Sequence, residues 1–318
     1  MKKLLTITLA LLTFILMSCG KSKVDANGCY ANFDDALEVA QKKNKDIMLI
    51  ISMDEDDEDS KDFMDKIVRN ENFKKEIAEQ YAVVNMDFSQ KTFEAAANDK
   101  DKSELLEKNR KLVTLLQVSD VPVVYIISKE QYLIKGFFYD DENRSYEGFK
   151  NELADKAALI EQMHKMIYQT KIGTAEEKIS AIEDLYQATN PTYRIFLIDL
   201  MDSVKKLDPS NSSGLVGKYI YETAAEKSNK AYLEGDIRAA VDAYLKIADE
   251  ELVQNETKQI ALYTAAYMSS KTELDSIPVV IEYLNKAIAF APESEQVPAI
   301  KRVIAALEAQ AAAEAKAE

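Results

Sequence analysis

One short apolar run most constrains how this chain folds. Residues 47–51 are all apolar and follow Lys45 and Asp46, which predicts a short strand buried on both faces, as inside a parallel or mixed sheet. Six acids follow over 54–59, and residues 61–69 carry apolar side chains at helical spacing. Many α/β folds place their chemistry in such a strand-to-helix turn, because the helix N-terminus presents free N–H groups. Here the turn holds acids and no thiol.

The first half of the chain continues as an α/β pattern. Helical apolar spacing predicts amphipathic helices over 31–43 and 73–80. Apolar runs predict further strands over 81–87, 121–127 and 132–138. A polar insertion over 89–109 is expected to form a loop, followed by one exposed helix over 102–116.

The order of these elements resembles the thioredoxin-like superfamily, in its lipoprotein-type branch. That family has a strand, then Trp-Cys-x-x-Cys at the start of a helix, and later a strand entered through a cis-proline. Counting back from Phe73 puts Asp57 and Ser60 at the two cysteine positions. The resemblance covers about 31–153, within an expected domain over 31–155, and implies a central mixed sheet flanked by helices.

The two residues at the cysteine positions do not support dithiol exchange. That reaction needs a thiolate nucleophile and a second thiol to resolve the mixed disulfide. Asp57 and Ser60 supply neither, so the resemblance implies a redox-inactive site without a catalytic residue or cofactor. We expect a solvated acidic loop over 54–59, whose carboxylates favour the helix N-terminus. A divalent-cation site there is the alternative, although the run lacks the alternation and glycine of an EF-hand loop.

A second candidate binding site is the predicted cis-proline turn at Val121 and Pro122. In the resembled fold, the backbone before this proline adds an extended peptide as an extra strand. That surface needs no cysteine. Val121, Pro122 and Tyr125, beside the turn over 57–60, are therefore the candidate peptide groove.

The N-terminus resembles a bacterial lipoprotein signal. Two lysines precede an apolar stretch over 4–17, which is too short to span a bilayer, and Leu16-Met17-Ser18-Cys19 fits the cleavage box. We expect removal of residues 1–18 and acylation of Cys19. A polar tether over 19–30 would then hold the protein on the extracytoplasmic side of the inner or outer membrane of a bacterial envelope.

Acylation of Cys19 leaves Cys29 as a free thiol. A free cysteine commonly packs as a small buried residue, which is our interpretation of Cys29. A thiol–disulfide relay through Cys29 or a partner's thiol remains the alternative. The net charge of −15 argues against nucleic acid as a partner.

From Tyr146 onward the sequence predicts only helices. They are expected over 147–169, 175–188, 193–207, 215–234, 236–251, 258–269, 277–290 and 295–310. Segments 231–244 and 283–292 resemble tetratricopeptide repeats, with Ala240 and Ala287 at helix crossings and tyrosines filling between helices. This implies a helical solenoid over 156–310, followed by an Ala/Glu-rich tail over 311–318, expected as a fraying helix or a disordered end.

These features favour a membrane-anchored, non-catalytic adaptor or assembly factor with an envelope protein as its partner. His164, the single histidine, is interpreted as structural, because sequence spacing places no carboxylate beside it.

Overall fold

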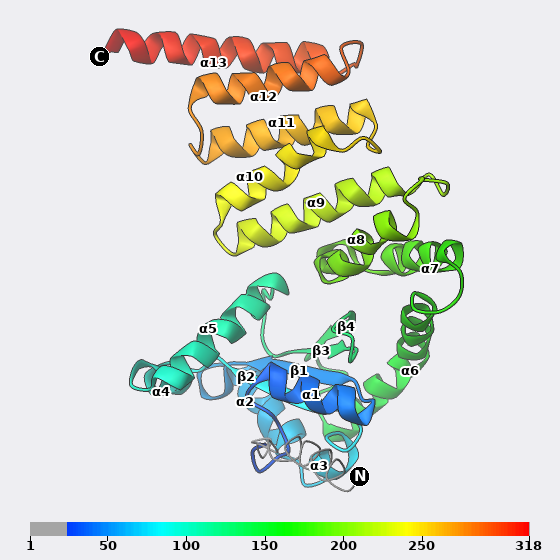
Figure 1. The fold of residues 1–318 in the computed structure, drawn as a ribbon. Helices are drawn as coiled ribbons and strands as arrows, with labels where there is room; N and C mark the ends of the chain where they lie inside the picture. Colours follow the sequence, from blue (N-terminus) through cyan, green and yellow to red (C-terminus); the bar gives the residue numbers. More distant parts are fainter. Residues whose placement is uncertain (1–23, 318) are drawn as a thin grey trace, which may run out of the picture.

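The computed structural model describes residues 24–317 (Figure 1). It has an α/β part built on one sheet, followed by an all-helical part that leads away from it. The predicted signal peptide, its cleavage box and Cys19 lie outside the described residues. Within residues 24–317, no helix combines the length and apolar character needed to cross a bilayer.

A four-stranded mixed sheet, ordered β2-β1-β3-β4, forms the centre of the α/β part. β1 (Ile47–Ser52) pairs in parallel with β2 (Ala82–Asp87) and antiparallel with β3 (Val123–Ile127). β4 (Leu133–Phe138) continues the sheet antiparallel to β3. Every residue of β1 is buried, which confirms the central strand predicted from the apolar run.

Successive side chains of β1 enter two different cores, because a strand projects alternate residues to opposite faces. Met48 and Ile50 belong to one core. Ile47, Leu49 and Ile51 belong to the other. The second core is covered by α1 (Phe33–Lys43) and α5 (Lys100–Leu115). The first is covered by α2 (Glu58–Phe63), a π turn (Met64–Val68), α3 (Phe73–Glu76) and α6 (Tyr146–Gln169).

The polar insertion contains two helices where the sequence predicted a loop and one helix. α4 (Gln90–Ala97) occupies most of the expected loop, and alanine's high helix propensity accounts for its last turn. Asp99 then starts α5, because its carboxylate accepts the N–H groups of Asp101 and Lys102.

The expected tether over 19–30 is in part a component of the domain. The Tyr30 N–H donates to the Val83 carbonyl at 2.8 Å, and the Tyr30 carbonyl accepts the Asn85 N–H at 3.0 Å. These bonds extend the sheet beyond β2 by one bridge. The polar composition of the segment concealed this pairing, since backbone groups make it.

The expected domain boundary between residues 155 and 156 falls inside α6, which is 24 residues long. Phe149 near its start and Ile167 near its end are buried in the same core. That core continues without a break to Leu185 and Tyr219 in the helical part. The two parts of the chain therefore share one hydrophobic core.

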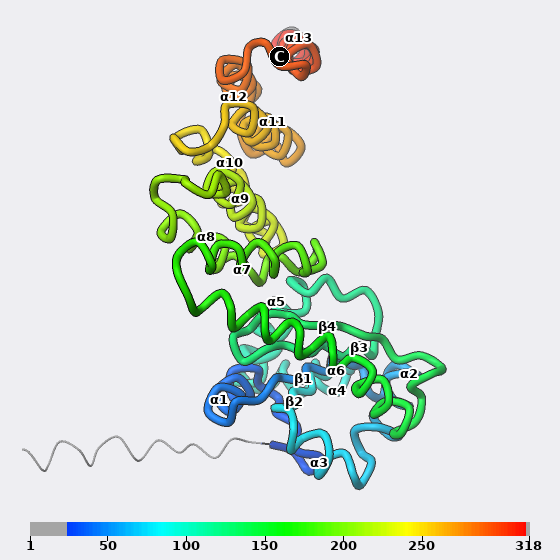
Figure 2. The backbone as a smooth tube through the Cα atoms, turned by 90° about the vertical axis from the view of Figure 1, so that its right-hand side faces the viewer, coloured from blue at the N-terminus to red at the C-terminus, as the bar shows by residue number. Residues whose placement is uncertain are grey.

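The helical part stacks its helices one upon another, away from the sheet (Figure 2). The α-helices are α7 (Ala175–Ala188), α8 (Ile198–Leu207), α9 (Val216–Leu233), α10 (Ile237–Leu245), α11 (Asn255–Lys271), α12 (Ile277–Phe290) and α13 (Val297–Ala317). Two 3₁₀ segments, η3 (Pro191–Leu197) and η4 (Lys246–Asp249), precede α8 and follow α10. The single helix predicted over 236–251 is thus an α-helix that tightens into η4. The predicted tail is helical through Ala317, as its Ala, Glu and Lys content favours.

Small residues and tyrosines behave differently in this stack. Ala240 and Ala287 are fully buried, as predicted for positions where helices approach closely. Tyr219 is also buried, but Tyr232 and Tyr267 are 53% and 56% exposed. The prediction that the tyrosines fill between helices is therefore wrong for these two.

Candidate functional site

The turn after β1 carries the two residues at the expected cysteine positions, and both make hydrogen bonds within the turn. Asp57 is the N-cap of α2, where its carboxylate accepts the Ser60 N–H at 2.6 Å. The Ser60 hydroxyl accepts the Met53 N–H at 3.1 Å and is completely buried. The turn is therefore closed by hydrogen bonds that begin the helix, at the place where a dithiol would have stood.

The acids over 54–59 do not converge, and most of them have separate partners. Asp54 pairs with Arg69 at 2.5 Å, and Asp59 pairs with Arg144 at 2.9 Å. The Asp56 carboxylate accepts the Gln90 N–H at the start of α4. In the part of the chain that the structure describes, no three His, Cys, Asp or Glu side chains lie close enough to hold a metal ion. The acids instead tie the turn to its surroundings.

Asp62, one turn further along α2, extends these contacts. It accepts hydrogen bonds from Lys66 and from the Tyr139 hydroxyl, the latter at 2.8 Å. The bond from Lys66, together with that from Tyr139, lowers the pKa of Asp62. Tyr139 follows β4, so this carboxylate links the helix to the far edge of the sheet.

The predicted cis-proline turn lies at the same end of the sheet. The peptide bond between Val121 and Pro122 is cis, as the sequence pattern predicts. Because Ile51 pairs with Val123, this turn adjoins the end of β1 that leads to the Asp57 cap. Val121 is half-buried and Pro122 is buried. The Val121 N–H, the group expected to receive a peptide, donates to the carboxylate of exposed Asp120 at 3.0 Å.

Tyr125 does not belong to this surface, and its inclusion in the candidate groove is corrected. It is 2% exposed and packs edge-on against Tyr193 of η3, with ring centroids 6.1 Å apart. Burial, with a smaller effect of Tyr193, raises the pKa of its phenol. The sequence could not show this because Tyr193 comes from the helical part, which covers the middle of β3.

Cys29, the cysteine that the structure describes, is buried in the core. It is 3% exposed, and its N–H donates to the Asp25 carboxylate at 2.9 Å. Burial, reinforced by the negative charge of Asp25, raises the pKa of the thiol. Since the thiolate is the reacting species, this environment suppresses exchange chemistry at Cys29. The described residues contain no pair of cysteines that could form a disulfide.

His164 has a carboxylate partner that sequence spacing did not reveal. Its Nε2 lies 2.8 Å from an oxygen of Asp46, which precedes β1 and is 118 positions away in the chain. The hydrogen bond to Asp46 raises the pKa of His164, while partial burial opposes the shift. This pair joins α6 to the central strand.

Comparisons with known proteins match the α/β part and the helical part of the chain to two different families. Residues 29–128 match a family described as thioredoxin-like. Residues 215–313 match a family described as "Uncharacterised protein C-terminal domain". An uncharacterized protein of Treponema pallidum (strain Nichols) is 29% identical over 130 residues, which are 41% of this chain and 43% of that protein.

A search of solved structures gives a similarity to a protein named DsbH oxidoreductase. The sequence identity is 18%, the match covers 43% of this chain and 90% of that one, and the TM-score is 0.34. Taken with the mixed sheet, the family match over 29–128 defines an N-terminal thioredoxin-like α/β domain, which an all-helical region follows.

Proposed function

We propose that this chain is an envelope lipoprotein that binds partner proteins on a thioredoxin-like scaffold and performs no thiol–disulfide chemistry. The observation that carries the proposal is that Asp57 and Ser60, at the expected cysteine positions, make structural hydrogen bonds within the turn. A fold alone does not define an activity. The scaffold remains, but the groups that react in a dithiol site are replaced by groups that hold the turn closed.

The cis-proline end of the sheet is the binding surface that we favour. An extended peptide would take the Val121 N–H in place of the exposed Asp120 carboxylate, which now accepts it. Glu58 is exposed on the neighbouring turn, as is Glu55, whose ion pair with Lys91 is long at 3.8 Å. These charges favour a partner segment with basic residues, because complementary charge speeds and orients association.

The helical part supports an adaptor role in a second way. Its stacked antiparallel helices, with Ala240 and Ala287 at close crossings, fit the tetratricopeptide-like repeats that the sequence resembles. Such stacks present extended surfaces to partners. In this proposal Cys19 carries the acyl chains, and the partners are proteins of the envelope.

The redox alternative would depend on Cys29, which would have to leave the core to react. The cation alternative would need the acids over 54–59 to exchange their present partners, such as Arg69 and Arg144, for an ion. Neither alternative has a specific observation in its favour.

Capture of partners from detergent-solubilised envelopes tests the proposal. The lipidated full chain is compared with Cys29→Ser, with Val121→Arg and with Val303→Arg, the last a matched control at a valine on α13 that is 36% exposed. We expect a partner that is retained by the wild type, Cys29→Ser and Val303→Arg, lost by Val121→Arg, and unchanged on non-reducing gels. A band that shifts on reduction and disappears in Cys29→Ser would contradict the proposal.

A further inference from the structure

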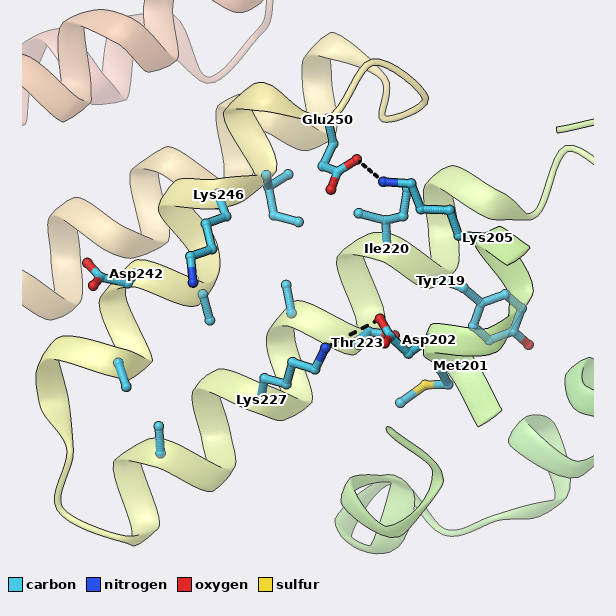
Figure 3. Close-up of a pocket in the computed structure, with 15 residues that line it drawn as sticks. Met201, Asp202, Lys205, Tyr219, Ile220, Thr223, Lys227, Asp242, Lys246 and Glu250 are labelled. Atoms are coloured by element: carbon cyan, nitrogen blue, oxygen red, sulfur yellow. Dashed lines mark hydrogen bonds and ion pairs between the residues drawn. The ribbon is translucent and has the colours of Figure 1, made fainter. Parts of the chain in front are cut away.

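A cavity in the helical part has features that protein packing alone does not explain. It lies between α8, α9 and the α10–η4 segment and has a volume of about 450 Å³ (Figure 3). This is within the range of about 300–1,000 Å³ typical of small-molecule sites. Its apolar lining is formed by Met201, Ile220, Ala224, Ala239, Ala243 and Ile247. Alanines on facing helices leave this space open.

The polar side chains at the edge of the cavity are largely paired with one another. Lys205 pairs with Glu250 at 2.6 Å, and Lys227 pairs with Asp202 at 3.3 Å. Asp242 pairs with Arg238 at 3.7 Å. Each acid that lines the cavity therefore has a cation within ion-pair distance, although Arg238 is shared with Asp275.

Lys246 differs from the other two lysines that line the cavity. Among the residues that the structure describes, it has no ion-pair partner. Its side chain is exposed and lines the cavity, so its ammonium group can pair with a ligand. It is suited to an anionic group of a ligand.

Thr223 provides the second and independent sign of a ligand. Thr223 lines the cavity and is 3% exposed, and its hydroxyl has no hydrogen-bond partner among residues 24–317. Buried polar groups are nearly always hydrogen-bonded, because leaving one unpaired is costly. Figure 3 shows Thr223 on α9 and Lys246 on η4, on different walls of the cavity. A ligand oxygen would satisfy the hydroxyl.

We propose that this cavity binds a small aliphatic carboxylate that carries a second oxygen. The hydrocarbon part lies against the apolar lining, the carboxylate pairs with Lys246, and the second oxygen bonds to the Thr223 hydroxyl. The site is separate from the cis-proline end of the sheet, so it extends the function proposed above and does not depend on it.

Calorimetric titration of the full chain with three eight-carbon probes tests the proposal. The probes are 8-hydroxyoctanoate, octanoate, which lacks the second oxygen, and 1,8-octanediol, which lacks the carboxylate. We expect 8-hydroxyoctanoate to bind most tightly, with at least about a fivefold loss of affinity for each missing group, as for a hydrogen bond made in a partly buried site.

Two variants assign the contacts. Lys246→Met should remove the advantage of 8-hydroxyoctanoate over 1,8-octanediol. Thr223→Val, which keeps the shape of the side chain, should remove its advantage over octanoate. Lys230→Met, on α9 outside the cavity, is the matched control and should bind all three probes as the wild type does.

Ala243→Leu fills the cavity and should abolish binding while the thermal unfolding temperature is maintained. The proposal is overturned if the wild type binds none of the probes, if the three bind equally, or if Ala243→Leu remains folded and binds normally. These measurements involve no envelope partner, so their failure and a failure of the adaptor role are distinguishable.

Discussion

Asp57 and Ser60 make the hydrogen bonds that hold the turn between β1 and α2. Both keep the helix start in place, Asp57 through its carboxylate and Ser60 through its backbone N–H and hydroxyl. A thiol at either position would be a weaker hydrogen-bonding group. The turn therefore relies on oxygen groups for its stability.

Loss of the cap should be measurable as a loss of stability. Asp57→Ala removes the acceptor of the Ser60 N–H, and N-cap replacements cost about 0.5–2 kcal/mol. Urea unfolding should show a decrease of this size. Glu55→Ala, at an exposed acid of the same turn, is the control and should change the free energy of unfolding by less than about 0.5 kcal/mol. Equal effects of the two variants would argue against the capping role.

Gly136 on β4 is required by the ring of Tyr125. A Cβ atom there would lie 2.6 Å from Tyr125 Cε1, too close for any side chain. Gly136→Ala should destabilise the protein by about 1–3 kcal/mol, as overpacked cores do. Adding Tyr125→Leu should recover part of this loss in the same unfolding measurement. Additive losses in the double variant would show that the contact does not limit the packing.

The features that could be predicted from the sequence are those formed by residues close together in the chain. The missing cysteines and the cis-proline turn follow from local patterns. The contacts of Tyr125 with Tyr193 and of His164 with Asp46 do not, since each joins residues far apart in the chain. The cavity lined by Thr223 could not be predicted for the same reason. The spacing of alanines predicts that helices approach closely, but it does not predict a space between three helix segments.

The helix α6 is both the last helix on the sheet and the first of the helical part. Periodicity predicted its length correctly, but periodicity does not indicate which neighbours a helix face contacts. Apolar runs located all four strands. The pairing of Tyr30 with the sheet was missed because backbone groups make it.

The contact between His164 and Asp46 should make the docking of α6 depend on pH. The hydrogen bond to Asp46 raises the pKa of His164 above the ordinary value for histidine. Its stabilisation is therefore complete below the unfolded pKa and is lost as pH rises through the folded pKa. The His164 side chain is 40% exposed, so solvent screening limits the effect to less than about 1 kcal/mol.

Unfolding by urea between pH 5.5 and 8.5 measures this effect. The free energy of unfolding of the wild type minus that of His164→Gln should decrease as pH rises. A difference that is constant or increases with pH would contradict the assigned ion pair.

For the whole molecule, the shared core implies cooperative unfolding of the sheet and the first helices of the stack. Leu185 on α7 is fully buried in the core that also contains Met48 of β1. Leu185→Ala should cost about 2–5 kcal/mol. Native-state hydrogen exchange should then show reduced protection of β1 amides as well as those of α7.

Ile300 on α13 is the matched control, because it is equally buried but lies in a separate outer core. Ile300→Ala should loosen the last helices and leave exchange in β1 unchanged. If Leu185→Ala affects only α7 and α8, the two parts unfold independently.

The chain has an N-terminal thioredoxin-like domain, and we propose that this domain performs no thiol–disulfide chemistry. The most direct test is the rate at which the purified chain accelerates reduction of insulin disulfides by dithiothreitol, beside Cys29→Ser and a dithiol thioredoxin as the positive control. We expect the wild type and Cys29→Ser both to match the rate without protein. Acceleration by the wild type that is lost in Cys29→Ser would contradict the proposal.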